Sequence, residues 1–302
     1  MVRNRNSRGM DLALLYLLNF LIEFGIWRIP IITLILGGLQ LIMFLGIGPN
    51  FLISDTIQDV IISPYEIIKN KQYSRIFFGQ MEHGSDFHLY YNIMSFCWKG
   101  YYIERTVGFR RYLAMMIVFI AACGFGTVYT TYAWYLITGN QNYYSNGVIG
   151  FSSVIFALKI VLSAYDPLAE VNVGGLGRMA MNIGAWFELI LMSLFNPHSS
   201  FIGHLIGILV GYEYCKGFIL KNVVQSLEAA IGIGLELSGL DEVLERRAED
   251  WNAQDDGNAP QNAGMGMRMG MFGMGGLGGM GMGRGMGMGG YGMPRRRMYR
   301  GY

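Results

Sequence analysis

Long apolar stretches separated by short polar segments dominate residues 1–220 of the chain. A helix needs about 20 mostly apolar residues to cross the hydrocarbon core of a bilayer, and several stretches approach that length. The pattern therefore predicts an all-α polytopic membrane protein whose six transmembrane helices lie at residues 29–48, 87–103, 111–137, 148–165, 179–196 and 201–220.

A further apolar stretch, residues 11–27, carries Glu23 in its body and is a candidate for a seventh span. The distribution of arginine argues for a helix in the membrane interface instead. With six spans and a cytosolic N-terminus, the loops on the opposite side, 138–147 and 197–200, contain no Lys or Arg, as the positive-inside rule requires. The cytosolic segments hold Arg3, Arg5, Arg8, Arg105, Arg110, Arg111 and Arg178.

Composition agrees with this setting. Hydrophobic residues make up 52% of the chain, charged residues only 15%, and the mean hydropathy is +0.32, which is unusual for a soluble domain. A net charge of +2 does not point to nucleic acid. Because Cys97, Cys123 and Cys215 all fall in apolar stretches, we expect no disulfide.

The chain changes character after residue 220. Residues 221–250 alternate apolar and charged positions as an amphipathic helix does. Residues 264–293 contain fifteen Gly and ten Met, a composition that cannot bury enough surface to fold, so we expect a disordered tail over 251–302 with a basic end. Methionine sulfur also binds Cu(I), but a flexible spacer is the favoured interpretation, and we expect no metal and no cofactor.

Two polar positions near the ends of predicted spans carry the candidate chemistry. Ser152 lies about four residues inside the fourth span and His204 about three inside the sixth, so helical rise places both roughly 5 to 6 Å below the same membrane edge. Ionisable side chains in a membrane are costly and point to function. A histidine is the base that activates a serine near neutral pH, so the sequence predicts a catalytic dyad of Ser152 and His204.

Small residues favour close approach of these two helices. Gly203, Gly207 and Gly211 share one face of the sixth span, a spacing that lets helices meet closely in lipid. The alternative is that the glycines only pack helices and that the serine and histidine are incidental.

His88 and Asn92 are four residues apart, hence on one face of the second span, near the same membrane edge. Beside a serine nucleophile they are candidate donors to a tetrahedral oxyanion, together with the backbone N–H of Ser152. Taken alone, the pair could equally be an interhelical hydrogen bond.

These residues resemble the rhomboid intramembrane serine proteases over about residues 29–220. The resemblance implies a Ser–His dyad without an aspartate, six core helices and cleavage of substrate transmembrane helices near their lumenal or outer end. It rests on His83, His88 and Asn92, on Glu104-Arg105 with Gly108, on Gly150-Phe151-Ser152-Ser153, and on Gly203-His204 with Gly207 and Gly211.

The chain departs from the family in a few places. Ser153 stands where Gly often follows the nucleophile, and both residues are small. The family's Trp-Arg pair in the first loop is Ser74-Arg75 here, which puts the usual anchoring of that loop in doubt. Within the family, the segments 98–100, 156–159 and 200–211 resemble an endoplasmic-reticulum branch whose cytosolic tails engage ubiquitin and an AAA ATPase.

That branch implies an endoplasmic-reticulum membrane protein with cytosolic termini, transmembrane substrates and a role in membrane protein quality control. The spacing of Leu227, Ala230, Ile231 and Leu235 fits a ubiquitin-interacting helix, although a helix on the membrane surface is favoured. Glu188, deep in the fifth span, is interpreted as an interhelical partner. The competing functions are a catalytically silent scaffold that delivers membrane clients to degradation machinery, and, more remotely, a transporter.

Overall fold

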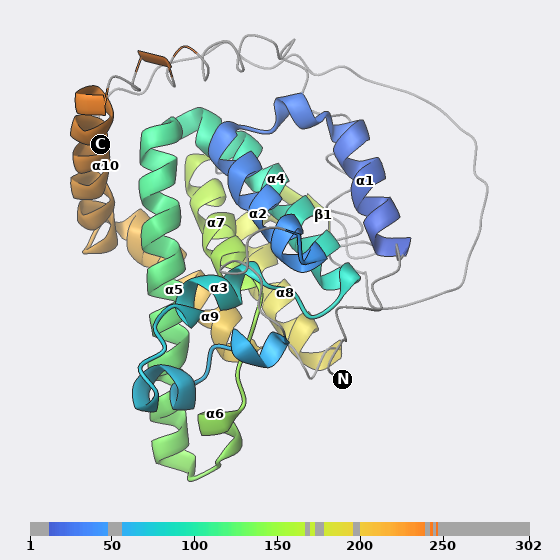
Figure 1. The fold of residues 1–302 in the computed structure, drawn as a ribbon, viewed down its shortest axis with the longest axis vertical. Helices are drawn as coiled ribbons and strands as arrows, with labels where there is room; N and C mark the ends of the chain where they lie inside the picture. Colours follow the sequence, from blue (N-terminus) through green and yellow to red (C-terminus); the bar gives the residue numbers. More distant parts are fainter. Residues whose placement is uncertain are drawn as a thin grey trace.

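The computed structural model describes residues 12–47, 56–166, 170–172, 178–195, 200–238, 242–243 and 246. These residues form a helical bundle with a smaller lobe at one end (Figure 1). The predictions for residues 1–11 and for the Gly/Met tail lie outside the described residues. The bundle helices are α1 (Leu12–Phe24), α2 (Ile31–Leu45), α4 (Asp86–Val107), α5 (Phe109–Thr138), α7 (Ser152–Tyr165), α8 (Met181–Phe195), α9 (Phe201–Lys216) and α10 (Leu220–Ser238).

Helix α1 packs lengthwise on α4. Tyr16 meets Tyr90, and Phe24 meets Tyr101 edge-on at a centroid distance of 5.8 Å, so the two helices run in the same direction. A contact of this kind is typical of a further helix in the bundle. The 13 residues of α1 rise only about 20 Å, less than the ~30 Å of a bilayer core. Both interpretations of this segment, interfacial helix and seventh span, stay predictions.

Helix α5 is the longest element, with 30 residues that rise about 45 Å. By length and composition, α5 is the one straight helix among the described residues that could cross a membrane. Helices α9 and α10 meet the same requirements of length and composition only as a pair, across a bend of 74°. Helices α1, α2, α7 and α8 are shorter apolar helices, so the count of six spans stays a prediction.

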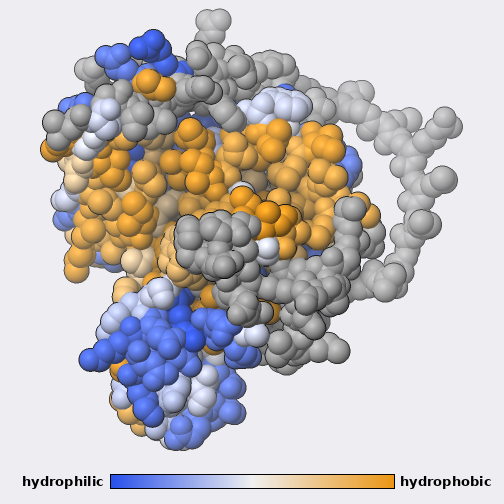
Figure 2. Space-filling view, viewed as in Figure 1, coloured by the Kyte–Doolittle hydropathy of each residue, from blue (hydrophilic) through white to orange (hydrophobic). Residues whose placement is uncertain are grey.

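The sides of the bundle are apolar and the lobe is hydrophilic. Figure 2 shows an apolar belt over the helices on this face and a hydrophilic lobe below it. The lobe contains the 3-10 helix η3 (Ile57–Asp59), the π-helix η4 (Tyr65–Lys69), α3 (Arg75–Met81) and α6 (Asn142–Ser145). Polar side chains gather there because these elements lie at one end of the bundle, beyond its apolar sides.

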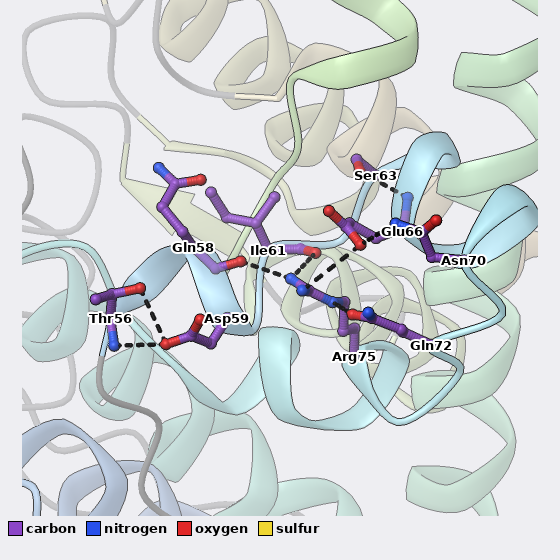
Figure 3. Close-up of polar contacts among 9 residues, drawn as sticks. All are labelled: Thr56, Gln58, Asp59, Ile61, Ser63, Glu66, Asn70, Gln72 and Arg75. Atoms are coloured by element: carbon purple, nitrogen blue, oxygen red, sulfur yellow. Dashed lines mark hydrogen bonds and ion pairs between the residues drawn. The ribbon is translucent and has the colours of Figure 1, made fainter.

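Arg75 holds the lobe together (Figure 3). Its guanidinium donates to the carbonyls of Gln58 (2.6 Å) and Ile61 (3.2 Å) and lies 3.6 Å from the Glu66 carboxylate. The sequence left the anchoring of this loop in doubt because Ser74 replaces the family's Trp. The arginine anchors the loop without it, through two backbone carbonyls and the side chains of Gln72 and Glu66.

One element departs from the predicted all-α class. Residues 170–172 and 178–180 form a two-stranded antiparallel hairpin, β1 (Glu170–Asn172) and β2 (Arg178–Ala180), before α8. Helix α8 consequently begins at Met181 rather than at residue 179. Each strand has only three residues. Three residues are too few to show the alternating pattern from which a strand can be predicted.

A sharp turn joins α9 to α10. Gly217 ends α9 in the left-handed conformation (φ +77°), so α9 stops four residues short of the predicted boundary at 220. The Glu213 carboxylate accepts hydrogen bonds from the backbone N–H groups of Ile219 and Leu220. Helix α10 then packs along α5, where Arg111 and Glu228 pair at 2.8 Å.

The apolar face of α10 packs against the main core through Leu227, Ile231 and Leu235. These residues belong to the set whose spacing fits a ubiquitin-interacting helix. The predicted helix at 221–250 is present as α10, which ends at Ser238. Its apolar stripe covers part of the bundle.

Candidate active site

The N-terminus of α7 places the candidate nucleophile. Gly150 has φ +109°, a conformation that side-chain-bearing residues rarely adopt, so the helix cannot extend back through it. Ser152 is therefore the first residue of α7 rather than a residue four positions inside a span. The first N–H groups of a helix have no intrahelical acceptor, and that of Ser152 is one of them.

The N-terminus of α9 places the histidine. Ser200 caps this helix: its hydroxyl accepts a hydrogen bond from the Gly203 N–H at 3.0 Å, and its carbonyl accepts one from the His204 N–H. His204 thus lies in the first turn, and its side chain is buried. Its Nε2 is 2.8 Å from Ser152 Oγ, with the hydroxyl donating when that nitrogen is unprotonated. The two residues that the sequence pairs are within hydrogen-bond distance.

Glycines set the spacing between α7 and α9. A Cβ at Gly207 would lie 3.0 Å from Phe156 Cβ and would overlap the Ser153 carbonyl, while one at Gly211 would lie 2.6 Å from the Ala157 carbonyl oxygen. The predicted close approach is confirmed for these two residues. Gly203 lies instead beside its own N-cap, Ser200, and near Thr127 of α5.

An aromatic ring supports the imidazole. Phe156, one turn after Ser152 on α7, stacks on His204 with centroids 4.6 Å apart and planes 25° apart. The ring restricts rotation of the imidazole and excludes water from one side of it. This contact was not predicted from the sequence, although the i, i+4 spacing from Ser152 places Phe156 on the face that carries the nucleophile.

His88 lies against the loop that leads into α7. A Cβ on Gly150 would be 2.6 Å from the His88 Cε1, so the ring touches the backbone two residues before Ser152. His83 meets His88 edge-on, with centroids 4.9 Å apart. Burial, and secondarily the neighbouring His88, lower the pKa of His83 well below its usual value.

Asn92 is buried one turn after His88 on α4. Its amide Nδ2 donates to the His88 carbonyl at 2.7 Å, a hydrogen bond within α4 rather than one to Ser152 or His204. An amide nitrogen carries two protons, so one of them is left for a further acceptor. The structure therefore places Ser152 and His204 in contact, His88 against the nearby Gly150, and Asn92 one turn after His88.

The lobe is joined to the same loop. Ile62 and Val148 exchange two backbone hydrogen bonds of 3.0 Å, and the Gly150 N–H donates to the Gly79 carbonyl at 2.8 Å. These bonds connect the lobe that Arg75 organises to the turn before Ser152.

Glu188 has the interhelical partner that the sequence predicted without naming it. Its carboxylate forms an ion pair with Lys159 of α7. Ser152, Phe156 and Lys159 follow one another at i, i+4 and i+7, hence along one face of α7. This spacing is the feature of the sequence that places Lys159 on the same face of α7 as Ser152.

Comparison with known proteins identifies the family. A family model described as a Rhomboid domain matches residues 70–221. Rhomboid-related protein 4 of Homo sapiens is 32% identical over 222 residues, which cover 74% of this chain and 68% of the relative. The Mus musculus protein of that name is 31% identical over 217 residues, covering 72% and 67%.

A plant relative is also similar. Rhomboid-like protein 14, mitochondrial, of Arabidopsis thaliana is 32% identical over 193 residues, which cover 63% of this chain and 56% of the relative. No solved structure matches the chain. The matched domain and the apolar helices identify an integral membrane protein. The chain belongs to the rhomboid family.

Proposed function

We propose that the chain is an intramembrane serine endopeptidase that cleaves transmembrane helices of membrane proteins through Ser152 and His204. The observation that carries this proposal is the 2.8 Å separation of Ser152 Oγ and His204 Nε2 in a partly buried site, in which the histidine is buried. Membership of a family that contains serine proteases supports it.

In this mechanism His204 takes the proton of Ser152 as the oxygen attacks the scissile carbonyl. The resulting oxyanion accepts hydrogen bonds from the Ser152 backbone N–H and from His88 and Asn92. His204 then protonates the leaving amine, and a water molecule, deprotonated by His204, hydrolyses the acyl-enzyme. The stack on Phe156 holds the imidazole in place during these proton transfers.

The substrate is a membrane-embedded helix because the dyad lies at the N-terminal ends of two apolar helices. Cleavage near the end of a substrate helix follows from that position. Substrates whose helices are weakened by Gly or Pro expose their carbonyls more easily and are the preferred class.

We place the protein in the endoplasmic-reticulum membrane with cytosolic termini, where the tail recruits ubiquitin or an AAA ATPase for membrane protein quality control. The arginine distribution supports the orientation. Acceptor sites for N-glycosylation inserted in loop 138–147 and after residue 302 test it. Glycosylation of the site after residue 302, and not of the site in loop 138–147, would show that the topology is the reverse of the one proposed.

Labelling with a serine-directed fluorophosphonate in detergent tests the catalytic proposal. The parent protein is expected to react and to cleave a transmembrane substrate. Ser152→Ala and His204→Ala are expected to lose both activities while keeping thermal stability close to the parent, because the dyad acts as a unit. The matched control is Ser153→Ala, which removes the neighbouring hydroxyl and is expected to keep both activities.

Cleavage by Ser152→Ala above a few per cent of the parent rate would overturn the assignment. A folded parent that neither reacts nor cleaves, but binds membrane clients, would establish the silent scaffold instead.

A further inference from the structure

A buried ion pair lies deeper in the bundle than the dyad. Lys159 of α7 and Glu188 of α8 are paired, with side chains that are only 7% and 17% exposed. Lys159 is seven residues after Ser152, so helical rise places it about 10 Å further along α7. The pair joins α7 to α8 within the apolar part of the bundle.

Stability alone gives no reason for this pair. Two charges in an apolar interior are costly to desolvate, and replacing such a pair by apolar residues of similar size is often neutral or stabilising. Apolar contacts between α7 and α8 already exist, since Phe156 and Ile160 share a core cluster with Ala185 and Leu189. The charges therefore require another explanation.

The contacts of Lys159 lead to the dyad. Its ammonium lies over the Phe156 ring, 4.8 Å from the centroid, within range of a cation–π interaction. The same Phe156 ring stacks on His204. A second buried ammonium, Lys99 of α4, differs in this respect, because it donates to Ser95 of its own helix.

We propose that Lys159 and Glu188 are positioning residues of the dyad: Glu188 holds the Lys159 ammonium on the Phe156 ring, and this ring holds the His204 imidazole toward Ser152. This inference rests on the proposed function and deepens it. A bare phenyl ring in an apolar core can tilt. A ring in contact with both a fixed cation and an imidazole has fewer orientations, which keeps the base in line with the hydroxyl.

The test distinguishes two roles of the ion pair: linking α7 to α8, and holding the Lys159 ammonium on the Phe156 ring. In Glu188→Gln the carboxylate is lost, and both the rate of fluorophosphonate labelling at Ser152 and kcat for a transmembrane substrate are expected to fall at least about tenfold, as small misplacements of catalytic groups do. KM is expected to stay within about twofold of the parent, because the substrate contacts are unchanged.

Two double variants supply the discrimination. Lys159→Met with Glu188→Leu removes both charges, and Lys159→Glu with Glu188→Lys keeps an ion pair but moves the ammonium away from Phe156. Both are expected to match the parent in thermal stability yet to label slowly. Lys99→Met, which removes the other buried ammonium, is the matched control and is expected to label at the parent rate.

The proposal is wrong if either double variant labels at the parent rate, because the pair then only joins α7 to α8. It is also wrong if Glu188→Gln labels at the parent rate. Phe156→Leu gives an independent check: in that background Glu188→Gln is expected to cause no further loss, since the route to His204 is gone. Failure of the parent itself to label would instead overturn the proposed function.

Discussion

Helices α9 and α8 both pack on α7, but they do so by different means. Helix α9 approaches through Gly207 and Gly211, which bring its backbone against the carbonyls of α7. Helix α8 makes contact through longer side chains, including Leu189 and the pair of Glu188 with Lys159. A backbone contact has no rotamers to adjust, whereas side chains can repack. The dyad lies across the contact that cannot adjust.

The comparison is broken most severely by Gly207→Leu. A leucine there cannot be accommodated by rotation, because the atoms it meets include the Ser153 backbone. Overpacking of this kind costs about 1–3 kcal/mol or more. We expect labelling at Ser152 to fall by about 10² or more, because α9 carries the base and must move away from the nucleophile.

Thermal stability in detergent and fluorophosphonate labelling measure the two effects. Gly234→Ala on α10 is the control, since no atom lies within 4 Å of the added Cβ. Full labelling of a folded Gly207→Leu protein would mean that the α7–α9 contact is as adjustable as the α7–α8 contact.

Leu189→Ala sharpens the comparison from the other side. This residue of α8 is 2% exposed, and its truncation is expected to cost about 2–4 kcal/mol through the cavity it leaves. The protein that remains folded is expected to lose much less labelling than Gly207→Leu, because the side chains around the cavity, Phe156 among them, can relax without moving the α9 backbone. A loss of labelling without a loss of stability would contradict this division.

The smallest effect is expected for Glu228→Gln, which breaks the ion pair that joins α10 to α5. The two side chains are 40% and 25% exposed, and pairs of this kind contribute about 1 kcal/mol or less. Labelling should be unchanged. A thermal shift that disappears in high salt would identify the lost term as electrostatic.

The sequence predicted the parts of the site that depend on local spacing. Apolar stretches placed Ser152 and His204 at matched ends of two helices, and the glycine stripe indicated their approach. The start of α7 could not be predicted, because a glycine adopts positive and negative φ about equally readily and the sequence does not show that Gly150 takes the positive one. The partner of Glu188 could not be named either, since helical periodicity gives the face of a residue but not the helix that covers it.

The lobe was the least predictable region. Arg75 is anchored by carbonyls 14 and 17 residues earlier in the chain, and every residue offers a carbonyl whatever its side chain. The lengthwise contact of α1 with α4 could not be predicted either. Both helices are apolar on several faces, and the sequence alone does not show which of these faces pack together.

The turn between α9 and α10 also affects how the fold responds to a pulling force. A force that pulls on the chain beyond Ser238 acts first on the contact between α10 and α5. This contact includes Leu227, Ile231 and the Arg111–Glu228 ion pair. The capped turn at Gly217 is loaded next, and the helix that carries His204 last. A force on this segment is therefore expected to separate α10 from α5 before it moves His204.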